Sequence, residues 1–205
     1  MTDVVLPGGR DTRGTLVEPD GDPHAVVVAC PPHPQHGGSR SDRRLVAVSD
    51  ALRDVGITSL RFDYGPWDEG YGEREDVRNA VRWARDEFDG CPVGVFGYSF
   101  GATLAVLASA DVDPDAVAVL APTARLADDL DALEALDALE APFHVLYGER
   151  DTTVDWEPIV ERARGRGDET TALSADHFFV GAADDIASTV RAFFERTLLE
   201  SAVDD

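Results

Sequence analysis

The chain contains no lysine, and most of its charged residues are acidic. Its 205 residues include 40 aspartates and glutamates against 18 arginines, which gives a net charge of −22 at pH 7. A surface with so large a negative charge repels the phosphate backbone of nucleic acids and the anionic face of membranes. We therefore expect neither a nucleic acid nor a membrane as a partner.

An acidic composition without lysine resembles that of proteins from extreme halophiles. In dilute buffer the carboxylates repel one another and strain a compact chain. At molar salt the Debye length falls to about 3 Å, and most of this repulsion is screened. The composition thus favours a halophilic protein, and an ordinary acidic protein is the alternative.

Long hydrophobic runs are also missing, and cysteine is scarce. No apolar stretch approaches the ~20 residues that a transmembrane helix needs, and residues 1–4 lack the features of a signal peptide. Two cysteines, Cys30 and Cys91, fit a reducing compartment, so a cytoplasmic location is expected. Cys30 should end one parallel strand and Cys91 should precede another. That arrangement puts them at opposite edges of the sheet, too far apart for a disulfide.

Neither a linker rich in proline or serine nor an internal repeat divides the chain, so we expect one α/β domain over residues 1–205. Short apolar runs alternate with segments of helical length. This alternation predicts a mostly parallel sheet with helices on both faces and antiparallel pairing only at its start. The expected strands are 4–6, 14–18, 25–29, 57–62, 92–96, 116–120, 143–147 and 170–173. The expected helices are 41–55, 73–88, 100–109, 157–164 and 184–199.

One further segment, 128–139, has leucines at helical spacing beside acidic residues. This spacing predicts a single amphipathic helix that is too short to form a cap domain. Two roles are open for it: a surface helix docked on the edge of the sheet, or a small lid formed by residues 126–139.

The most informative motif is Gly-Tyr-Ser-Phe-Gly at 97–101, which lies between an apolar strand and an apolar helix. A sharp strand-to-helix turn strains the backbone of its central residue, here Ser99. Glycines two positions before and after that residue let the strand and the helix pass closely. Hydrolases hold a nucleophile at such a turn. The structural alternative is a serine that caps the helix and has no chemical role.

A serine hydroxyl becomes a nucleophile only beside a histidine base that a carboxylate orients. Asp151 comes shortly after an expected strand, and His177 follows the last expected strand. The chain order Ser99, Asp151, His177 is the order of the α/β-hydrolase fold. Asp155 and Asp176 are alternative acids, while Asp151 as a helix cap and His177 as a core residue are the structural alternatives.

The oxyanion of the tetrahedral intermediate needs two backbone donors. Phe100, the residue after the predicted nucleophile, supplies one N–H. The second should come from the loop 30–38 that follows the strand 25–29. Three prolines in this loop have no N–H, so Gln35 is the better candidate.

At this point the chain resembles the compact, cap-less α/β hydrolases related to dienelactone hydrolase. The resemblance covers nearly the whole chain through five motifs in one order: 32–38, 60–64, 72–76, 97–101 and 176–179. It implies a cap-less α/β-hydrolase fold and a serine hydrolase without a cofactor.

The sequence departs from this family's pattern at two places. Pro31 stands where a histidine is common, and Tyr-Gly-Pro-Trp at 64–67 replaces the usual Arg-Gly-Val-Gly turn. We therefore expect the entrance to the site to differ from that of the family.

The resulting prediction is a hydrolase of a small ester, thioester or other acyl compound. Ser99 would attack, His177 would move the proton and Asp151 would orient His177. The same residues would serve an acyl transferase or a peptidase, and a catalytically silent binding protein is the alternative from another class. The protein is expected to be a monomer or a homodimer.

Four aromatic residues near the expected mouth, namely Tyr64, Trp67, Tyr98 and Phe178, are predicted to contact the acyl group, although each could instead belong to the core. His33 and His36 beside Asp63 could suggest a metal site. The oxyanion-loop interpretation explains these histidines better, so no metal is expected.

Overall fold

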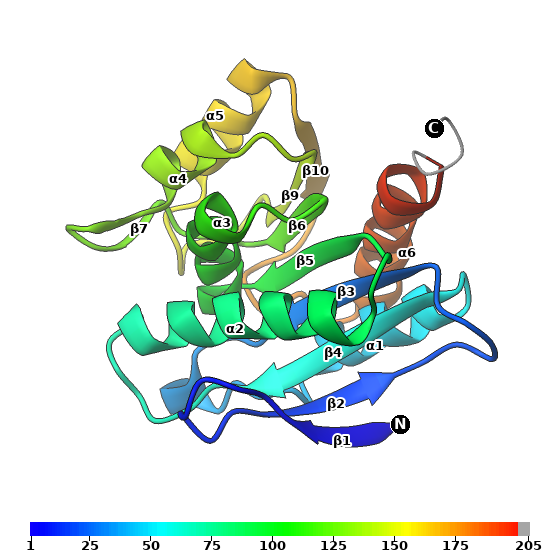
Figure 1. Ribbon diagram of the computed structural model, residues 1–205. Helices are drawn as coiled ribbons and strands as arrows, with labels where there is room; N and C mark the ends of the chain where they lie inside the picture. Colours follow the sequence, from blue (N-terminus) through cyan, green and yellow to red (C-terminus); the bar gives the residue numbers. More distant parts are fainter. Residues whose placement is uncertain (201–205) are drawn as a thin grey trace.

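Eight strands form one sheet in the order β1-β2-β4-β3-β5-β6-β9-β10 (Figure 1). This computed structural model describes residues 1–200, so the last five residues of the predicted domain, 201–205, lie outside the described residues. Strand β2 pairs antiparallel with β1 and β4, and the other pairs are parallel, as the sequence predicted. The strands are β1 (Thr2–Val5), β2 (Arg13–Val17), β3 (Ala25–Cys30), β4 (Ile57–Asp63), β5 (Val93–Tyr98), β6 (Ala116–Leu120), β9 (Phe143–Gly148) and β10 (Glu169–Leu173).

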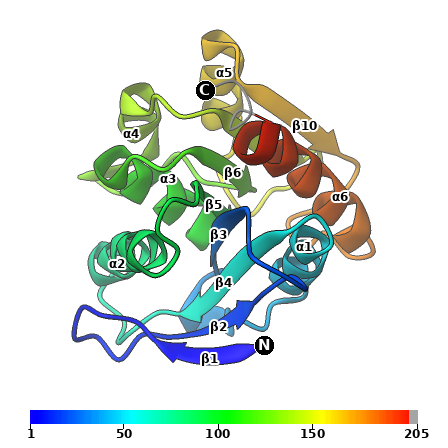
Figure 2. The ribbon, with the colours of Figure 1, turned by 45° about the vertical axis from the view of Figure 1, so that its right-hand side comes forward.

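Helices cover both faces of the sheet (Figure 2). Helices α1 (Arg43–Arg53) and α6 (Ala183–Phe194) pack together on one face, and α6 continues into a π-helical stretch (Glu195–Glu200). The opposite face carries α2 (Tyr71–Glu87), α3 (Phe100–Val112), α4 (Ala132–Ala138) and α5 (Glu157–Arg166). No helix within residues 1–200 combines the length and the apolar character needed to cross a bilayer.

The central strand β3 shows why this sheet is buried on both sides. Alternate side chains of a strand point to opposite faces of the sheet. Because helices cover both faces at β3, all six of its residues are buried. Val26 and Val28 pack into the core under α2 and α3, whereas Val27 and Ala29 pack into the core under α1 and α6. A continuous apolar run therefore fits a strand with a helical layer on each side.

The chain leaves β3 for β4 on one side and later returns to β5 on the other. The loops at the carboxyl ends of β3 and β5 consequently diverge, which is where open α/β sheets form their binding crevices. Cys30 at the end of β3 pairs with Gly97, while Cys91 precedes β5. Both thiols are free, which confirms that the two cysteines are not bonded to each other.

The segment predicted as one helix over 128–139 is only partly helical. Residues Arg125–Ala127 and Leu130–Asp131 form the separate hairpin β7–β8, which extends to the left of α3 in Figure 1. Helix α4 begins at Ala132 because the Asp131 carboxylate accepts the N–H groups of Leu133 and Glu134. The cap at Asp131 starts the helix later than the leucine spacing indicated.

Candidate active site

Ser99 lies between β5 and α3 in a backbone conformation that L-residues rarely adopt, with φ 56° and ψ −120°. The glycines on either side make this turn sterically feasible. A β-carbon on Gly97 would stand 2.3 Å from the Gly101 carbonyl oxygen, and a β-carbon on Gly101 would stand 2.3 Å from the Pro31 carbonyl oxygen. Both contacts are with backbone atoms, which cannot rotate away. The turn therefore requires glycine at both positions and presents the Ser99 hydroxyl at the carboxyl edge of the sheet.

The structure brings Ser99, His177 and Asp151 together from three separate loops. The Ser99 Oγ atom lies 2.9 Å from His177 Nε2, and His177 Nδ1 lies 2.7 Å from Asp151 Oδ2. A carboxylate can only accept a hydrogen bond, so Nδ1 carries the proton and Nε2 is left as an acceptor for the serine hydroxyl. This arrangement can activate the Ser99 hydroxyl as a nucleophile.

Asp151 is buried, and its two oxygens have different partners. While Oδ2 faces His177, Oδ1 accepts the N–H groups of Thr153 at 2.8 Å and Val154 at 3.4 Å. These bonds fix the carboxylate at the carboxyl end of β9. The two alternative acids, Asp155 and Asp176, are both exposed, and neither contacts the His177 ring among the bonds of residues 1–200.

A cavity of about 590 Å³ opens in front of the Ser99 hydroxyl. Its wall combines apolar and aromatic side chains with a few polar groups. Within the described part of the chain, the lining residues that carry a full charge are Asp42 and Arg44, and they form an ion pair with each other. The remaining wall is made mainly by His33, His36, Tyr98, Phe100, Thr123, Leu126, Val154 and Phe178.

The two predicted oxyanion donors differ in position. Phe100 is the first residue of α3 and lines the cavity, and its N–H has no acceptor among residues 1–200. Gln35 lies in a 3-10 turn (Pro34–His36), where its N–H donates to His33 Nδ1 at 3.3 Å, and it does not line the cavity. The prediction for Gln35 therefore disagrees with the structure, because the turn directs this N–H toward the His33 ring.

Two of the four residues predicted to contact the substrate line the cavity, and two do not. Tyr98 and the largely exposed Phe178 line the cavity. Trp67 lies beside it with its ring 4.7 Å from the His33 ring. Tyr64 lies behind the cavity wall, where its hydroxyl donates to the Pro31 carbonyl at 3.0 Å. Tyr64 thus supports the loop after β3 and does not face the cavity.

The two histidines of that loop make no contact with Asp63 that would form a metal site within residues 1–200. His33 and His36 stack with their ring centres 4.4 Å apart, and burial together with the nearby His36 lowers the pKa of His33. Asp63 instead accepts the Arg40 N–H at 2.7 Å. Residues 1–200 contain no group of three or more potential ligands among His, Cys, Asp and Glu that could hold a metal ion.

Solved structures resemble this chain over nearly its whole length. An α/β serine hydrolase homologue from Coxiella burnetii superposes with a TM-score of 0.81 at 22% identity, covering 94% of this chain and 96% of that one. A lid-less α/β serine hydrolase from Xanthomonas campestris gives 0.81 at 23% identity over 97% and 95%. A dienelactone hydrolase from Anabaena variabilis gives 0.79 at 22% identity over 96% and 97%. The chain has the α/β-hydrolase fold. No protein-family model and no curated protein sequence matches it.

Several residues at the site of this α/β-hydrolase fold were not predicted from the sequence. Thr123 and Leu126 come from the segment after β6, and Val154 follows the Asp151 turn. Arg44, in the first turn of α1, was also missed. Only the position of Val154, three residues after a predicted acid, offered a signal in the sequence. The other three reach the cavity through the folding of distant segments.

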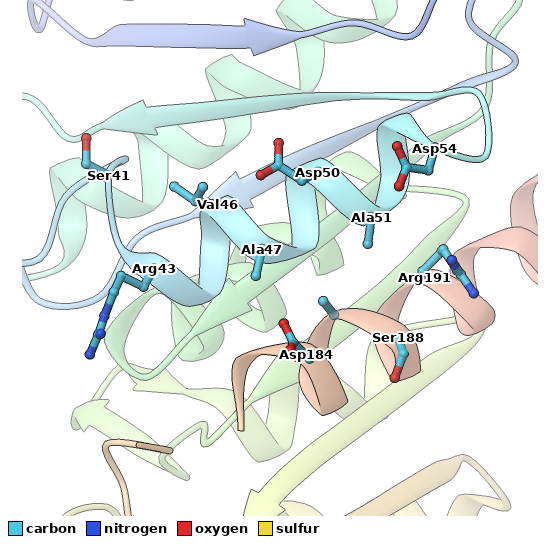
Figure 3. Close-up of a pocket in the computed structure, with 11 residues that line it drawn as sticks. Ser41, Arg43, Val46, Ala47, Asp50, Ala51, Asp54, Asp184, Ser188 and Arg191 are labelled. Atoms are coloured by element: carbon cyan, nitrogen blue, oxygen red, sulfur yellow. The ribbon is translucent and has the colours of Figure 1, made fainter. Parts of the chain in front are cut away.

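A second hollow of about 660 Å³ lies between α1 and α6, and Ser99, Asp151 and His177 do not line it. Figure 3 shows its side chains, including Arg43 and Asp50 on α1, Asp54 just after α1, and Asp184 and Arg191 on α6. Neither histidine nor cysteine is among the described residues that line it. Its two serines, Ser41 and Ser188, therefore have no histidine beside them among these residues, and the cavity at Ser99 is the candidate active site.

Proposed function

We propose that the protein is a serine hydrolase that cleaves a small ester, thioester or other acyl compound. The observation that carries this proposal is the chain of short contacts from Ser99 Oγ to His177 Nε2 and from His177 Nδ1 to the buried Asp151 carboxylate. A serine that only capped α3 would need neither contact, and Ser99 makes no side-chain bond that caps the helix. The α/β serine hydrolases among the similar structures support the same reaction class.

In this mechanism Ser99 Oγ attacks the acyl carbonyl carbon while its proton moves to His177 Nε2. Asp151 stabilises the imidazolium that forms. When the tetrahedral intermediate collapses, His177 gives the proton to the leaving group, and the acyl group remains on Ser99. A water molecule then attacks the acyl-enzyme and gives a proton to His177 Nε2. The bond from Ser99 Oγ to the acyl group breaks, Oγ takes that proton back from His177, and the acid product leaves.

The developing oxyanion requires two donors, and we propose the N–H groups of Phe100 and His33. His33 replaces Gln35 in this role because it lines the cavity and is the first residue after β3 that has an N–H, and this N–H has no acceptor among residues 1–200. Pro31 and Pro32 have none. The Phe100 N–H also lies at the amino end of α3, where the helix dipole favours negative charge.

The wall of the cavity favours an uncharged acyl group. Its two charged residues, Asp42 and Arg44, neutralise each other, and aromatic rings make up much of the remaining surface. The net charge of −22 also repels anionic substrates at low salt. We propose that the protein works in a salt-rich cytoplasm, because the same charge is screened there.

Two experiments test this proposal. A fluorophosphonate probe should add one phosphonyl group to Ser99, located by peptide mass spectrometry, and Ser99→Ala should remove the adduct. A series of nitrophenyl esters of increasing chain length should then show which acyl groups the cavity accepts. A folded protein that neither reacts with the probe nor cleaves any ester would instead be a catalytically silent binding protein. Cleavage of peptides in preference to esters would indicate a peptidase. Acyl transfer only in the presence of an amine or alcohol acceptor would indicate an acyl transferase.

A further inference from the structure

The loop that carries His177 is a tight turn with a strained residue. The Phe179 N–H donates to the Asp176 carbonyl, and the Phe178 N–H donates to the Asp176 carboxylate. Phe179 has φ 47°, in the left-handed region that is costly for a residue with a side chain. Its ring is nevertheless buried between the sheet and the helices α1 and α6. Such a turn keeps its shape only when neighbouring groups hold it.

Two side chains from outside the loop hold consecutive carbonyl groups within it. The Tyr98 hydroxyl donates to the His177 carbonyl at 2.9 Å, and Arg44 Nη1 donates to the Phe178 carbonyl at 2.7 Å. Tyr98 ends β5 next to Ser99, whereas Arg44 comes from α1. These bonds attach the loop to the strand that carries the nucleophile and to the first turn of a helix.

Arg44 and Tyr98 also hold each other. The Arg44 guanidinium lies 4.2 Å from the centre of the Tyr98 ring, a cation–π distance. Asp42 pairs with the Arg44 guanidinium through both carboxylate oxygens, with Nε to Oδ1 at 2.8 Å. It also accepts the Arg44 N–H as the N-cap of α1. The Arg44 side chain is therefore fixed in position and neutralised, although it lines the cavity.

We propose that Arg44 and Tyr98 form a clamp, defined by these two side chains, that positions the His177 imidazole between Ser99 and Asp151. This inference rests on the proposed function for its kinetic consequence, but its structural part concerns the His177 ring alone. Arg44 is a positioning residue here and not an anion-binding residue, because Asp42 already satisfies its charge. A shift of about 1 Å in the reacting groups can lower a rate roughly 100-fold, so the clamp should affect the chemical step.

The test compares Arg44→Met with Arg53→Met, since Arg53 lies on the same helix in exposed pairs with Asp50 and Asp54. For Arg44→Met we expect kcat for a neutral nitrophenyl ester to fall roughly 10- to 100-fold while KM stays within about twofold. Nuclear magnetic resonance of the imidazole nitrogens should show faster exchange of the His177 Nδ1 proton. Arg53→Met should change neither measurement.

Other results would overturn the clamp. A higher KM with an unchanged kcat would make Arg44 a substrate-binding residue. Unchanged kcat and proton exchange in Arg44→Met would also contradict it. If Arg44→Met does not fold, Tyr98→Phe removes only a hydroxyl and should produce the same changes more weakly. If the parent protein cleaves no ester, the proposed function fails, while the His177 proton signal still decides whether the clamp exists.

Discussion

Gly101 at the start of α3 lies directly against Pro31 in the loop after β3, so a β-carbon on Gly101 would stand 2.3 Å from the Pro31 carbonyl oxygen. This contact joins the turn that carries Ser99 to the loop that carries His33. The Tyr64 hydroxyl donates to the same Pro31 carbonyl. The close approach of these two backbones therefore sets the distance between the serine and the proposed oxyanion donors.

The first prediction follows from this contact. Gly101→Ala should lower the free energy of unfolding by about 1–3 kcal/mol and abolish activity, because the new methyl group meets rigid backbone. Gly165→Ala is the matched control, since within residues 1–200 a β-carbon at this helical position would meet no atom within 4 Å apart from its chain neighbours and the backbone of its own helix. That variant should gain about 0.5–1 kcal/mol. Denaturant unfolding at one fixed salt concentration measures both, and equal stability of the two variants would contradict the packing account.

The second prediction separates the candidate acids. Asp151→Asn should lower kcat by about 10⁴-fold, because an amide favours the wrong tautomer of His177. Asp155→Asn should have almost no effect, because that side chain is exposed and makes no hydrogen bond to other residues within 1–200. Steady-state kinetics on one ester measures the two variants. An unchanged kcat in Asp151→Asn would assign the role of orienting His177 to another carboxylate.

The third prediction concerns pH and His144 on β9. This side chain is 3% exposed and packs against Phe193, and its Nε2 lies 2.9 Å from Thr171 Oγ1. Burial lowers the pKa of His144 to about 4, although Glu169, with Oε2 3.9 Å from Nδ1, opposes this shift.

Between the unfolded pKa of about 6.5 and the folded pKa of about 4, only the unfolded chain binds this proton. The free energy of unfolding should therefore fall by up to ~3 kcal/mol as the pH drops through this window. In His144→Gln that part of the loss should disappear. Identical pH profiles for parent and variant would show that His144 is not buried in its neutral form.

The fourth prediction concerns salt. The melting temperature should rise between ~0.1 M and ~3 M potassium chloride, because screening reduces repulsion among the 40 carboxylates and salt strengthens apolar burial. Thermal unfolding followed by circular dichroism measures it. A flat melting temperature over that range would remove the basis for proposing a halophilic protein.

The sequence predicted the fold because the pattern of β3 and the turn at Ser99 are local. The apolar run 25–29 indicated a strand covered on both sides, and the glycines at 97 and 101 indicated a close approach of strand and helix; the structure shows both features. The error at Gln35 has a physical cause: counting free N–H groups does not reveal that a 3-10 turn directs one of them to His33 Nδ1.

Arg44 could not be found in this way. It meets the Phe178 carbonyl 134 positions further along the chain, and the contact exists only because α1 packs beside α6 and its preceding loop. The shortened helix at Ala132 illustrates the same limit on a smaller scale. A single capping carboxylate at Asp131 determined its start, and the spacing of apolar residues did not.

The most direct test of the account is the activity of Ser99→Ala, His177→Ala and the double variant toward an ester that the parent cleaves. Each single change should reduce kcat on the order of 10⁶-fold, and the double change should cost little more, because either deletion already disables the attack. Circular dichroism should show all three variants folded. Full activity of Ser99→Ala toward every ester that the parent cleaves would show that the turn at Ser99 is structural and that the hydrolase assignment is wrong.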